Sequence, residues 1–470
     1  MKPLTIQQIR QAVGGKALTA IPKDAPPVKS VSSNSQQLEP FSLFIAIKGA
    51  RMNGHDFLPD AAARGAVAAL VDEPPKHVLP NLHLIHVENT RRAMGRLATF
   101  VRKQMQATVI AVAGSNGKTT TKYFIDSVLS PFKRGSISPK SYNNDIGVPL
   151  AIFPADPSQD YLVLEIGTNH HGEVQNLSQL ALPDIAVITN VGAEHLEGLG
   201  DLDGVRREEA SIVTGLNPRG CLIVNGDDEG LVSLVSRYPG QIVKFGLKTA
   251  GNDLFATDIH CGTDGVRFNL NGDARRRVFV PMLGKHSACN ALAAIAVGRR
   301  MRLAEEAILA ALAQATGPEM RLQLSNVNGV TVLNDAYNAN PNSTRAAIET
   351  LLALPSRGRK VAVLGDMLEL GEHSDSYHRE IGQLGGSSRL DLLICVGKKA
   401  KLMAASAKEA GMEGPRIVTY PDALAAARGI TRRVRGQDLI LLKASRSVGL
   451  EAVAKAITER EKKFARRAAS

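Results

Sequence analysis

Short apolar runs alternate with amphipathic segments through the middle of the chain. The clearest apolar runs lie at 108–112, 161–166, 185–189 and 221–224. After the first of them, apolar side chains recur at helical spacing from Phe124 to Leu129. Strands alternating with helices predict the α/β class, with a mostly parallel sheet covered by helices. Ligands of such sheets bind beyond the carboxyl ends of the strands.

The same pattern appears on both sides of this region. Before it, a small α/β unit is predicted by apolar runs at 43–47, 66–71 and 84–87 and by a helical segment at 90–101. After it, an open, doubly wound, Rossmann-like sheet is predicted by runs at 330–335, 360–366, 392–397 and 439–443. A chain of 470 residues is too long for one core. We therefore expect three domains, at 1–106, 107–316 and 317–470.

A glycine-containing loop connects the run at 108–112 to the helix after it. Its residues are Gly114, Ser115, Asn116, Gly117, Lys118, Thr119 and Thr120. Free N–H groups and the helix dipole favour an anion there. Lys118 would meet the terminal phosphates of ATP, and the Thr119 hydroxyl would reach magnesium. An ordinary glycine turn is the alternative, but Gly-Lys-Thr after a β-run favours a phosphate loop.

This loop is shorter than the standard phosphate loop. The standard form has about four residues between its glycines. Here Ser115 and Asn116 alone separate Gly114 from Gly117.

Two candidate catalytic side chains follow other predicted strands of the central sheet. Glu165 lies at the end of one run, and His195 lies shortly after another. Each taken singly is more often an ordinary loop residue. Together with Thr119 they predict a magnesium site, with Lys118 as the third catalytic candidate. In the last domain, Asp335, Asp366 and Lys443 fall at the ligand-facing edge of the sheet.

The composition suggests an anionic partner. The formal net charge is +12, with no Trp and 4% aromatic residues. Nucleic acid, a membrane surface or a phosphorylated small molecule would each suit this charge, but the scarcity of aromatic residues argues against nucleic acid. We expect no membrane span, because no apolar run approaches the roughly 18 residues required. The four cysteines show no metal spacing, so we expect buried thiols and a cytoplasmic protein.

Six further segments, together with the short phosphate loop, resemble the Mur ligases of peptidoglycan synthesis. These segments are 143–149, 165–169 with 172–173, 190–198, 284–287 with 290–291, 335–341 and 365–371. Within the family they are most similar to the branch that adds D-alanyl-D-alanine. The branch that adds a diamino acid typically carries an arginine after Asn-Pro, whereas this chain has Asn342 there. Folylpolyglutamate synthases share the short loop.

The resemblance implies a three-domain ligase that uses ATP and Mg²⁺. Its substrates would be UDP-N-acetylmuramoyl-tripeptide and D-alanyl-D-alanine, joined through an acyl phosphate by a monomer. The first domain would bind the UDP end through Ser32, Ser33, Lys48 and His55, and the central domain would bind ATP. His286 and Asn290 match the adenosine-contacting motif. Nucleotide and substrate contacts from both later domains would include Asn143, Asn144, Arg321, Asp335, Tyr337, Asn338, Lys443 and Arg446.

The chain departs from the family at one expected metal ligand. The family carbamylates a lysine downstream of the matched histidine, which supplies a carboxylate to a second metal. The segment 204–210 has no lysine, and Glu209 falls at that position. Our hypothesis is that Glu209 supplies the carboxylate directly. The alternative is that Glu208 and Glu209 belong to an exposed helix face.

Other functions remain open at this stage. Within the same class, the chain could be another Mur ligase or a folylpolyglutamate synthase-like ligase. From a different class, it could be an ATP-switched nucleic-acid-binding module.

Overall fold

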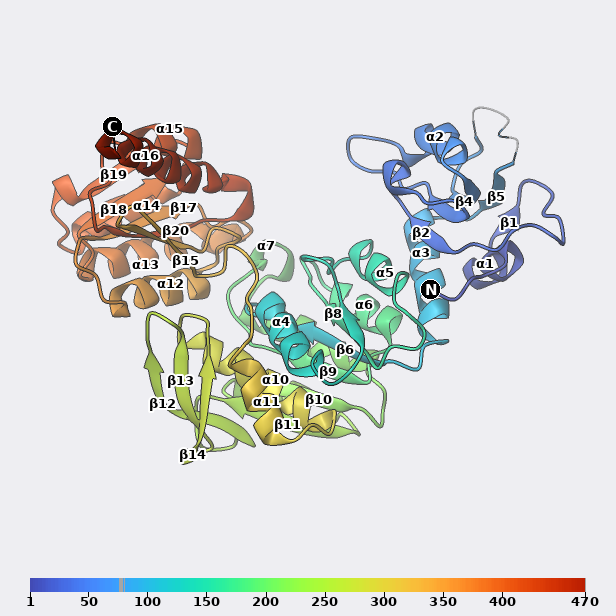
Figure 1. Ribbon diagram of the computed structural model, residues 1–470, viewed down its shortest axis with the longest axis horizontal. Coiled ribbons are helices and arrows are strands. Elements are labelled where there is room, and N and C mark those ends of the chain that lie inside the picture. The colour runs from blue at the N-terminus through green and yellow to red at the C-terminus, as the bar shows by residue number, and fades with distance from the viewer. Residues whose placement is uncertain (76–78, 80, 470) are drawn as a thin grey trace.

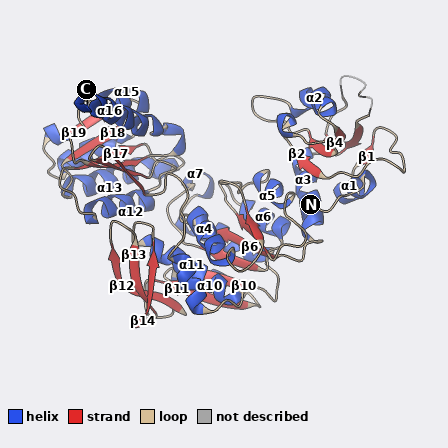
Figure 2. Ribbon diagram, in the orientation of Figure 1, coloured by secondary structure: helices blue, strands red, loops and turns tan. Residues whose placement is uncertain are grey.

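The computed structural model describes residues 1–75, 79 and 81–469, and within them the strands form three mixed, mostly parallel sheets. The sheets lie in three lobes arranged in an arc, with the central lobe between the other two (Figure 1). Helices and strands are interleaved in every lobe (Figure 2). Among the described residues, no helix is both long and apolar enough to cross a membrane.

The N-terminal sheet is built from short strands. In the described part of this lobe it is covered by three helices, α1 (Ile6–Val13), α2 (Leu58–Ala63) and α3 (Thr90–Arg102). Its strand order is β1 (Lys16–Ala17), β5 (His83–His86), β4 (Ala66–Val71), β3 (Ser42–Ile45) and β2 (Ser30–Ser32). β1 pairs antiparallel to β5, and the other pairs are parallel. Thr5 begins α1 with a capping box, which satisfies N–H groups of the first turn.

The central sheet is parallel over most of its width and ends in an antiparallel meander. Its order is β14 (Asp273–Val280), β13 (Val266–Leu270), β12 (Leu254–Cys261), β11 (Gln241–Gly246), β10 (Cys221–Asn225), β9 (Ile185–Ile188), β6 (Thr108–Ala113), β8 (Tyr161–Glu165) and β7 (Gly135–Ile137). Helices cover both faces, which explains why the middle strands are continuous apolar runs. The meander of β12, β13 and β14 was not expected from the sequence.

The helices of the central lobe connect these strands. They are α4 (Lys118–Leu129), α5 (Gly147–Ile152), α6 (Glu173–Ala181), α7 (Leu196–Leu199), α8 (Leu202–Ala210), α9 (Glu229–Val235), α10 (His286–Arg300) and α11 (Glu305–Leu312). Cys261 is exposed at the end of β12, so the expectation of buried cysteines is wrong for this residue.

The C-terminal sheet is doubly wound, as predicted. Its order is β15 (Gln323–Val327), β16 (Val330–Asn334), β20 (Leu439–Lys443), β17 (Lys360–Gly365), β18 (Leu392–Val396) and β19 (Ile417–Tyr420). β15 is antiparallel to β16, and the remaining pairs are parallel. Its helices are α12 (Pro341–Ala353), α13 (Ser374–Ser387), α14 (Ala400–Glu409), α15 (Ala423–Ile430) and α16 (Glu451–Ala469).

The cores join two of the lobes and leave the third separate. One apolar cluster runs from α1 through α3 into β6, β8 and β9 of the central sheet. Two other clusters cover the two faces of the C-terminal sheet. Among the described residues, Leu283 is their one buried member from the central lobe. The C-terminal lobe therefore meets the rest of the molecule mainly through polar side chains.

Candidate active site

The glycine loop connects β6 to α4 in a conformation that needs glycine at both ends. Gly114 and Gly117 have φ angles of 114° and 86°. A Cβ atom at Gly114 would lie 2.2 Å from Thr189 Oγ1. Across the described chain, no acceptor is recorded for the N–H groups of residues 117–120, which are the orphan donors of a helix N-terminus. The loop therefore has the geometry of a phosphate-binding site.

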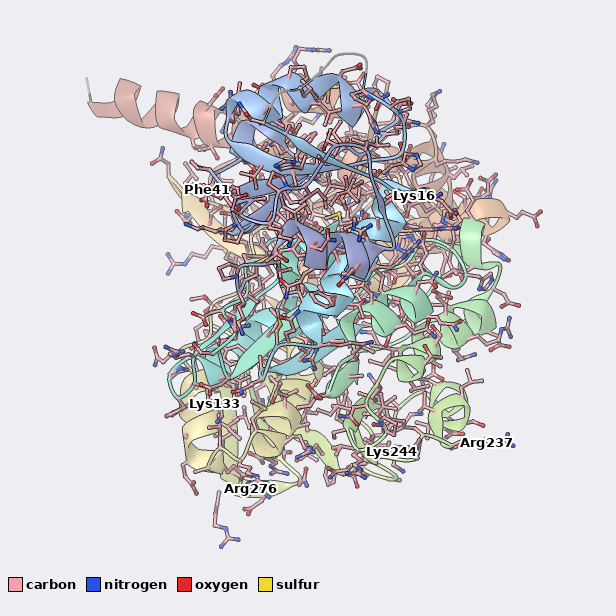
Figure 3. All side chains as sticks on the ribbon, turned by 90° about the vertical axis from the view of Figure 1, so that its right-hand side faces the viewer. Lys16, Phe41, Lys133, Arg237, Lys244 and Arg276 are labelled. Carbon is pink, nitrogen blue, oxygen red and sulfur yellow. The ribbon has the colours of Figure 1, made fainter. Side chains whose placement is uncertain are left out.

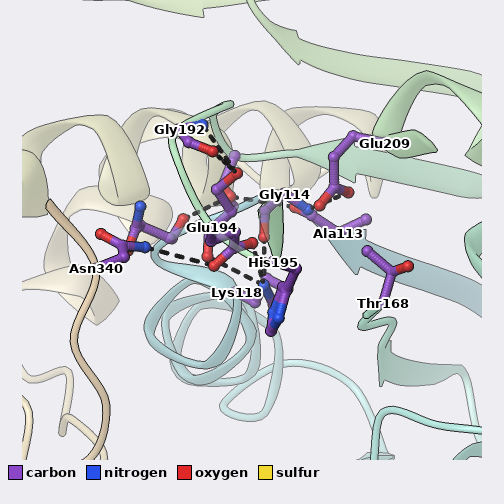
Figure 4. A network of polar contacts seen from close by, with 12 residues as sticks. Ala113, Gly114, Lys118, Thr168, Gly192, Glu194, His195, Glu209 and Asn340 are labelled. Atoms are coloured by element: carbon purple, nitrogen blue, oxygen red, sulfur yellow. Dashed lines mark hydrogen bonds and ion pairs between the residues drawn. The ribbon is translucent and has the colours of Figure 1, made fainter. Parts of the chain in front are cut away.

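The Lys118 side chain folds back onto this loop. Its Nζ donates to Gly114 O at 2.5 Å and to Ser115 O at 3.1 Å, and it lies 3.4 Å from Glu194 Oε1 (Figure 4). Burial disfavours the ammonium, but the carboxylates of Glu194 and Glu209 outweigh it and the pKa of Lys118 is raised. Lys118 is thus a fixed positive charge beside the free N–H groups.

Glu209 contacts the loop from the opposite side to Glu194. Its Oε2 accepts a hydrogen bond from the Gly114 N–H at 2.7 Å, and the residue is 1% exposed (Figure 4). Burial raises the pKa of Glu209 to about 7, although Lys118 opposes the shift. Glu208 is also buried and accepts from the N–H groups of Gly172 and Val174. The alternative of an exposed helix face is therefore wrong, because α8 presents both carboxylates to the protein interior.

Glu165 is paired with a lysine that the sequence analysis did not identify. Lys122 Nζ lies 3.1 Å from Glu165 Oε2, and the two side chains are 0% and 2% exposed. Asn143 donates from Nδ2 to the other Glu165 oxygen at 3.1 Å. Burial lowers the pKa of Lys122 despite this carboxylate. Since Lys122 lies one turn after Lys118 on the same face of α4, helical spacing was a signal that could have found it.

His195 turns toward the C-terminal lobe. It precedes α7 with a φ of 51°, and its Nδ1 lies 2.7 Å from Glu369 Oε2. Burial alone would lower the pKa of His195, but the Glu369 and Glu194 carboxylates outweigh it and the pKa is raised. His195 is therefore an imidazole poised beside two carboxylates rather than an isolated ligand.

A cavity of about 830 Å³ brings most of the predicted site residues together. From the central lobe it is lined by Ser115, Asn116, Gly117, Lys118, Thr119, Asn143, Asn144, Glu165 and His195. From the segment after α11 and the C-terminal lobe it is lined by Arg321, Tyr337, Asn338 and Arg446. The Arg321 guanidinium lies 4.3 Å from the centre of the Tyr337 ring, a cation–π arrangement.

Comparison with known proteins matches nearly the whole chain. Family models described as "Mur ligase family, catalytic domain", "Mur ligase middle domain" and "Mur ligase, glutamate ligase domain" match residues 27–102, 112–298 and 320–446. The UDP-N-acetylmuramoyl-tripeptide--D-alanyl-D-alanine ligase of Bacillus subtilis is 36% identical, covering 92% of this chain and 93% of that protein. The Escherichia coli enzyme of the same name is 34% identical, covering 98% and 99%. This chain belongs to the Mur ligase family.

Solved structures place this Mur ligase on the MurF-type branch. MurF from Acinetobacter baumannii is 31% identical with a TM-score of 0.87, covering 98% of this chain and 99% of that one. The MurF ligase from Thermotoga maritima, solved in complex with ADP, is 27% identical with a TM-score of 0.81, covering 93% and 99%.

Two predicted contact residues of this Mur ligase lie beneath the cavity rather than on its wall. Lys443 Nζ lies 2.6 Å from Asp335 Oδ2, and it also donates to Asn338 O at 3.0 Å. Burial lowers the pKa of Lys443 even with this carboxylate present. The buried pair holds the segment that carries Tyr337 and Asn338, so in this arrangement it supports the wall.

The residues predicted to contact adenosine lie at the start of α10. His286 is exposed there, and Asn290 is buried against Gly117, where a Cβ atom would lie 2.4 Å from Asn290 Oδ1. Within the described residues, Asn290 Nδ2 is a buried donor with no partner. Neither His286 nor Asn290 lines the cavity, so their contact with adenosine stays a prediction. Thr120 is buried in the first turn of α4 and does not line the cavity.

The predicted UDP-binding residues form a separate group in the N-terminal lobe. Lys48 Nζ lies 3.5 Å from Asp72 and 3.0 Å from Glu73. His55 is buried, and its Nε2 accepts from the Asp72 N–H at 3.1 Å. Ser32 closes a local turn by bonding to Asn34, and Ser33 follows it. The structure therefore brings Lys48 and His55 together, but away from the phosphate loop.

Contacts between the central and C-terminal lobes were missed by sequence reasoning. Asn340 Nδ2 donates to Asn116 Oδ1 at 2.9 Å, which ties α12 to the phosphate loop. The hydroxyls of Ser141 and Tyr337 lie 2.5 Å apart. Asn342 Oδ1 accepts from the Ala193 N–H and lines a neighbouring small cavity instead of the main one. No short-range pattern links residues this far apart in the chain.

Magnesium fits the cavity through few protein ligands. Among the described residues, no group of three or more His, Cys, Asp or Glu side chains could hold a metal by itself. Thr119 and Glu165 both line the cavity with oxygen donors, which magnesium prefers, and it usually takes its other ligands from phosphates and water. The buried ammonium of Lys122 already balances Glu165, so magnesium would share that carboxylate.

Proposed function

We propose that this Mur ligase adds D-alanyl-D-alanine to UDP-N-acetylmuramoyl-tripeptide and converts ATP to ADP and phosphate in the process. The observation that carries the proposal is the shared cavity. This cavity is lined by the phosphate loop, by the amides of Asn143 and Asn144, and by Tyr337, Asn338 and Arg446 of the C-terminal lobe. The UDP-N-acetylmuramoyl-tripeptide--D-alanyl-D-alanine ligases that it resembles over nearly their full length support the choice of acceptor.

The chemistry requires activation of a carboxylate. A carboxylate is a poor acyl donor, because its charge repels nucleophiles and oxide is a poor leaving group. Transfer of the γ-phosphoryl group of ATP to the tripeptide carboxylate gives an acyl phosphate and ADP. The dipeptide amine then attacks the acyl carbon, and the tetrahedral adduct loses inorganic phosphate to leave the new amide. Positioning and charge stabilisation supply most of the catalysis of phosphoryl transfer.

The residues on the cavity wall suit these roles. Lys118 and the free N–H groups of α4 would hold the phosphates and stabilise the transferring charge. Magnesium, held by Thr119 and Glu165, would neutralise phosphate charge when bound. His195, beside Glu369, would accept or relay a proton from the attacking amine.

The three lobes would divide the binding work. Residues 1–106 would hold the UDP end through Ser32, Ser33, Lys48 and His55, and residues 107–316 would bind ATP with a contribution from His286. Residues 317–470 would close over both substrates, with Asp335 and Lys443 supporting the closing wall.

A mass measurement tests the reaction and the acceptor together. The protein is incubated with UDP-N-acetylmuramoyl-tripeptide, D-alanyl-D-alanine and ATP-magnesium. The product should have the mass of the tripeptide plus the dipeptide minus water, with one phosphate released per product. Parallel reactions with a single amino acid or a diamino acid in place of the dipeptide, or with folate and glutamate in place of both substrates, should form no product. A product with one of those acceptors instead would assign the chain to a different ligase.

A further inference from the structure

A second, strongly basic cavity lies in the C-terminal lobe, away from the active site. It has a volume of about 1010 Å³, and its arginines are Arg359, Arg416, Arg428, Arg432, Arg433 and Arg435. It opens beside the amino ends of β17 and β18, whereas the active-site cavity faces the carboxyl ends of the same sheet. Helix α15, which forms one wall, lies on the side of the lobe away from the central sheet (Figure 1). We call this second cavity the arginine groove.

Two of the arginines build the floor of the groove. Arg359 donates from Nε and Nη2 to the two oxygens of Asp438, at 3.1 and 2.7 Å. Arg416 donates from Nη2 to the Leu390 carbonyl. These guanidinium groups are committed to the fold.

The guanidinium groups of the other four arginines are not committed to the fold in this way. Arg428, Arg432, Arg433 and Arg435 are exposed, on the last turn of α15 and the turn that follows. Within the described residues, their guanidinium groups have no recorded hydrogen bond or ion pair. One carboxylate, Asp391, lines the groove in the described chain, and its Oδ2 already accepts from the Lys360 N–H.

The groove holds more positive charge than the fold needs for its own hydrogen bonds and ion pairs. One basic side chain near the end of α15 would complement the helix dipole. Four uncommitted cations around one concavity repel each other, and a bound anion would relieve that repulsion. Guanidinium groups form paired hydrogen bonds with the oxygens of phosphate and carboxylate groups, which chloride cannot match. Of these anions, linked phosphates offer four neighbouring guanidinium groups the most negative charge and the most acceptor oxygens in a small volume. The volume is that of a small-ligand site rather than a single-ion site.

The chemistry of the groove also limits the partner. Tyr420 is its one aromatic lining residue in the described chain, and this half-buried ring packs against Gly429. Binding of single-stranded nucleic acid relies on several stacking platforms. The groove offers charge without such platforms.

We propose that the arginine groove binds a polyphosphate-class ligand that carries two or more phosphate groups close together. The source is a soluble polyphosphate compound, or the phosphates of neighbouring anionic lipid headgroups on a membrane surface. The site is independent of the proposed ligase reaction and lies at the opposite edge of the sheet.

Titration with inorganic tripolyphosphate tests the proposal on the full chain. The groove variant is Arg428→Gln/Arg432→Gln/Arg433→Gln. The matched control is Arg219→Gln/Arg237→Gln/Arg277→Gln, which removes the same charge from exposed arginines of the central lobe, and Arg237 is labelled low on that lobe in Figure 3. Lys118→Ala separates binding at the phosphate loop. The single variant Arg432→Gln serves if the triple variant unfolds at a lower temperature.

The wild type should show two classes of tripolyphosphate site. The groove variant should lose one class, with affinity reduced about tenfold or more, as expected for lost charged hydrogen bonds. Lys118→Ala should lose the other class, and the control should keep both. Arg432→Gln should weaken the groove class in the same direction but less.

A second arm distinguishes the source of the phosphate. Sedimentation with phosphatidylglycerol vesicles is compared with sedimentation with neutral phosphatidylcholine vesicles. Groove-dependent binding to the anionic vesicles without groove-dependent tripolyphosphate binding would support the proposal and assign the headgroup as source. If the groove variant matches the control in both arms, the proposal is wrong. A single-stranded oligonucleotide is titrated in the same way as a comparison. If the groove variant loses binding to the oligonucleotide alone, with both phosphate arms unchanged, the proposal is also wrong.

Discussion

At the scale of single residues, the phosphate loop is held closed by groups that a nucleotide would replace. The Lys118 ammonium donates to two carbonyls of its own loop and faces Glu194. Phosphate oxygens are better acceptors for an ammonium than neutral carbonyls are. When ATP binds, Lys118 would therefore exchange its contacts within the loop for contacts with the terminal phosphates. Its side chain already carries the positive charge before ATP binds.

Lys118→Ala should nearly abolish phosphate release. Removing one preorganised donor from a developing charge typically lowers kcat by about 100- to 1000-fold. Phosphate is measured with ATP-magnesium, UDP-N-acetylmuramoyl-tripeptide and D-alanyl-D-alanine all present. Lys103→Ala, at an exposed position after α3, is the control and should keep wild-type activity. Equal phosphate release by Lys118→Ala and wild type would remove Lys118 from the mechanism.

Glu209 should make the enzyme independent of carbon dioxide. Its carboxylate is built into the side chain and reaches the loop at Gly114. Wild-type activity should therefore stay constant when bicarbonate is added. Glu209→Lys should be inactive without bicarbonate and regain part of its activity with it, since only an amine can be carbamylated. Sharp stimulation of the wild type by bicarbonate would contradict the role given to Glu209.

At the scale of elements, the sequence predicts the strands that are buried on both faces and misses the partly exposed ones, which include the parallel strands β2, β7, β11 and β19. Buried strands such as β6 and β17 are uninterrupted apolar runs, because helices cover both of their faces. β12 and β14 are partly exposed and mix charged with apolar residues, so their periodicity is weak. A strand can therefore be predicted from this sequence when both of its faces are buried.

The N-cap of α12 should couple stability to nucleotide binding. Asn340 caps the helix through Ser343 and also donates to Asn116 in the phosphate loop. Asn340→Ala should cost about 1 kcal/mol of stability in urea unfolding, and it should also raise the KM for ATP. Thr5→Ala removes the comparable capping box of α1, far from the loop, and should change stability alone. An unchanged KM in Asn340→Ala would show that the contact between the lobes does not assist binding.

The packing of α13 against the segment after β17 should make stability depend on pH. His378 accepts the Met367 N–H at Nε2, and its Nδ1–H donates to Ser374 O, so the neutral ring is required. Burial lowers the pKa of His378, and the unfolded chain therefore binds the extra proton more readily. This contribution is complete above the ordinary histidine pKa of about 6.5. It is lost as the pH falls from there toward the lowered value.

The expected result is a steeper loss of melting temperature from neutral to mildly acidic pH in wild type than in His378→Gln. The exposed His260→Gln should keep the wild-type slope. Equal slopes in all three proteins would mean that His378 does not set the acid sensitivity.

At the scale of the whole molecule, the site depends on contacts between lobes that no local pattern contains. Gly114 to Thr120 could be found from the sequence because strand, glycine loop and helix are contiguous. Asn340 meets Asn116, and Glu369 meets His195, across a large separation in the chain. Glu194 has no sequence signal of its own, because its ion pair with Lys118 joins residues far apart in the chain. Local chemistry was predictable, and the pairing across the cavity followed from the three-dimensional arrangement.

The distribution of apolar clusters predicts two unfolding units in one chain. The N-terminal and central lobes share a continuous core through α3, whereas the C-terminal lobe has its own core on both faces of its sheet. Scanning calorimetry of the full chain should show two transitions. Leu97→Ala, in the shared core, and Ile348→Ala, in the C-terminal core, should each cost about 2–5 kcal/mol by leaving a cavity. Each variant should lower one transition and leave the other in place, because the lobes meet mainly through polar contacts that transmit little packing energy. A single transition lowered equally by both variants would show that the polar interface couples the lobes as strongly as a core does.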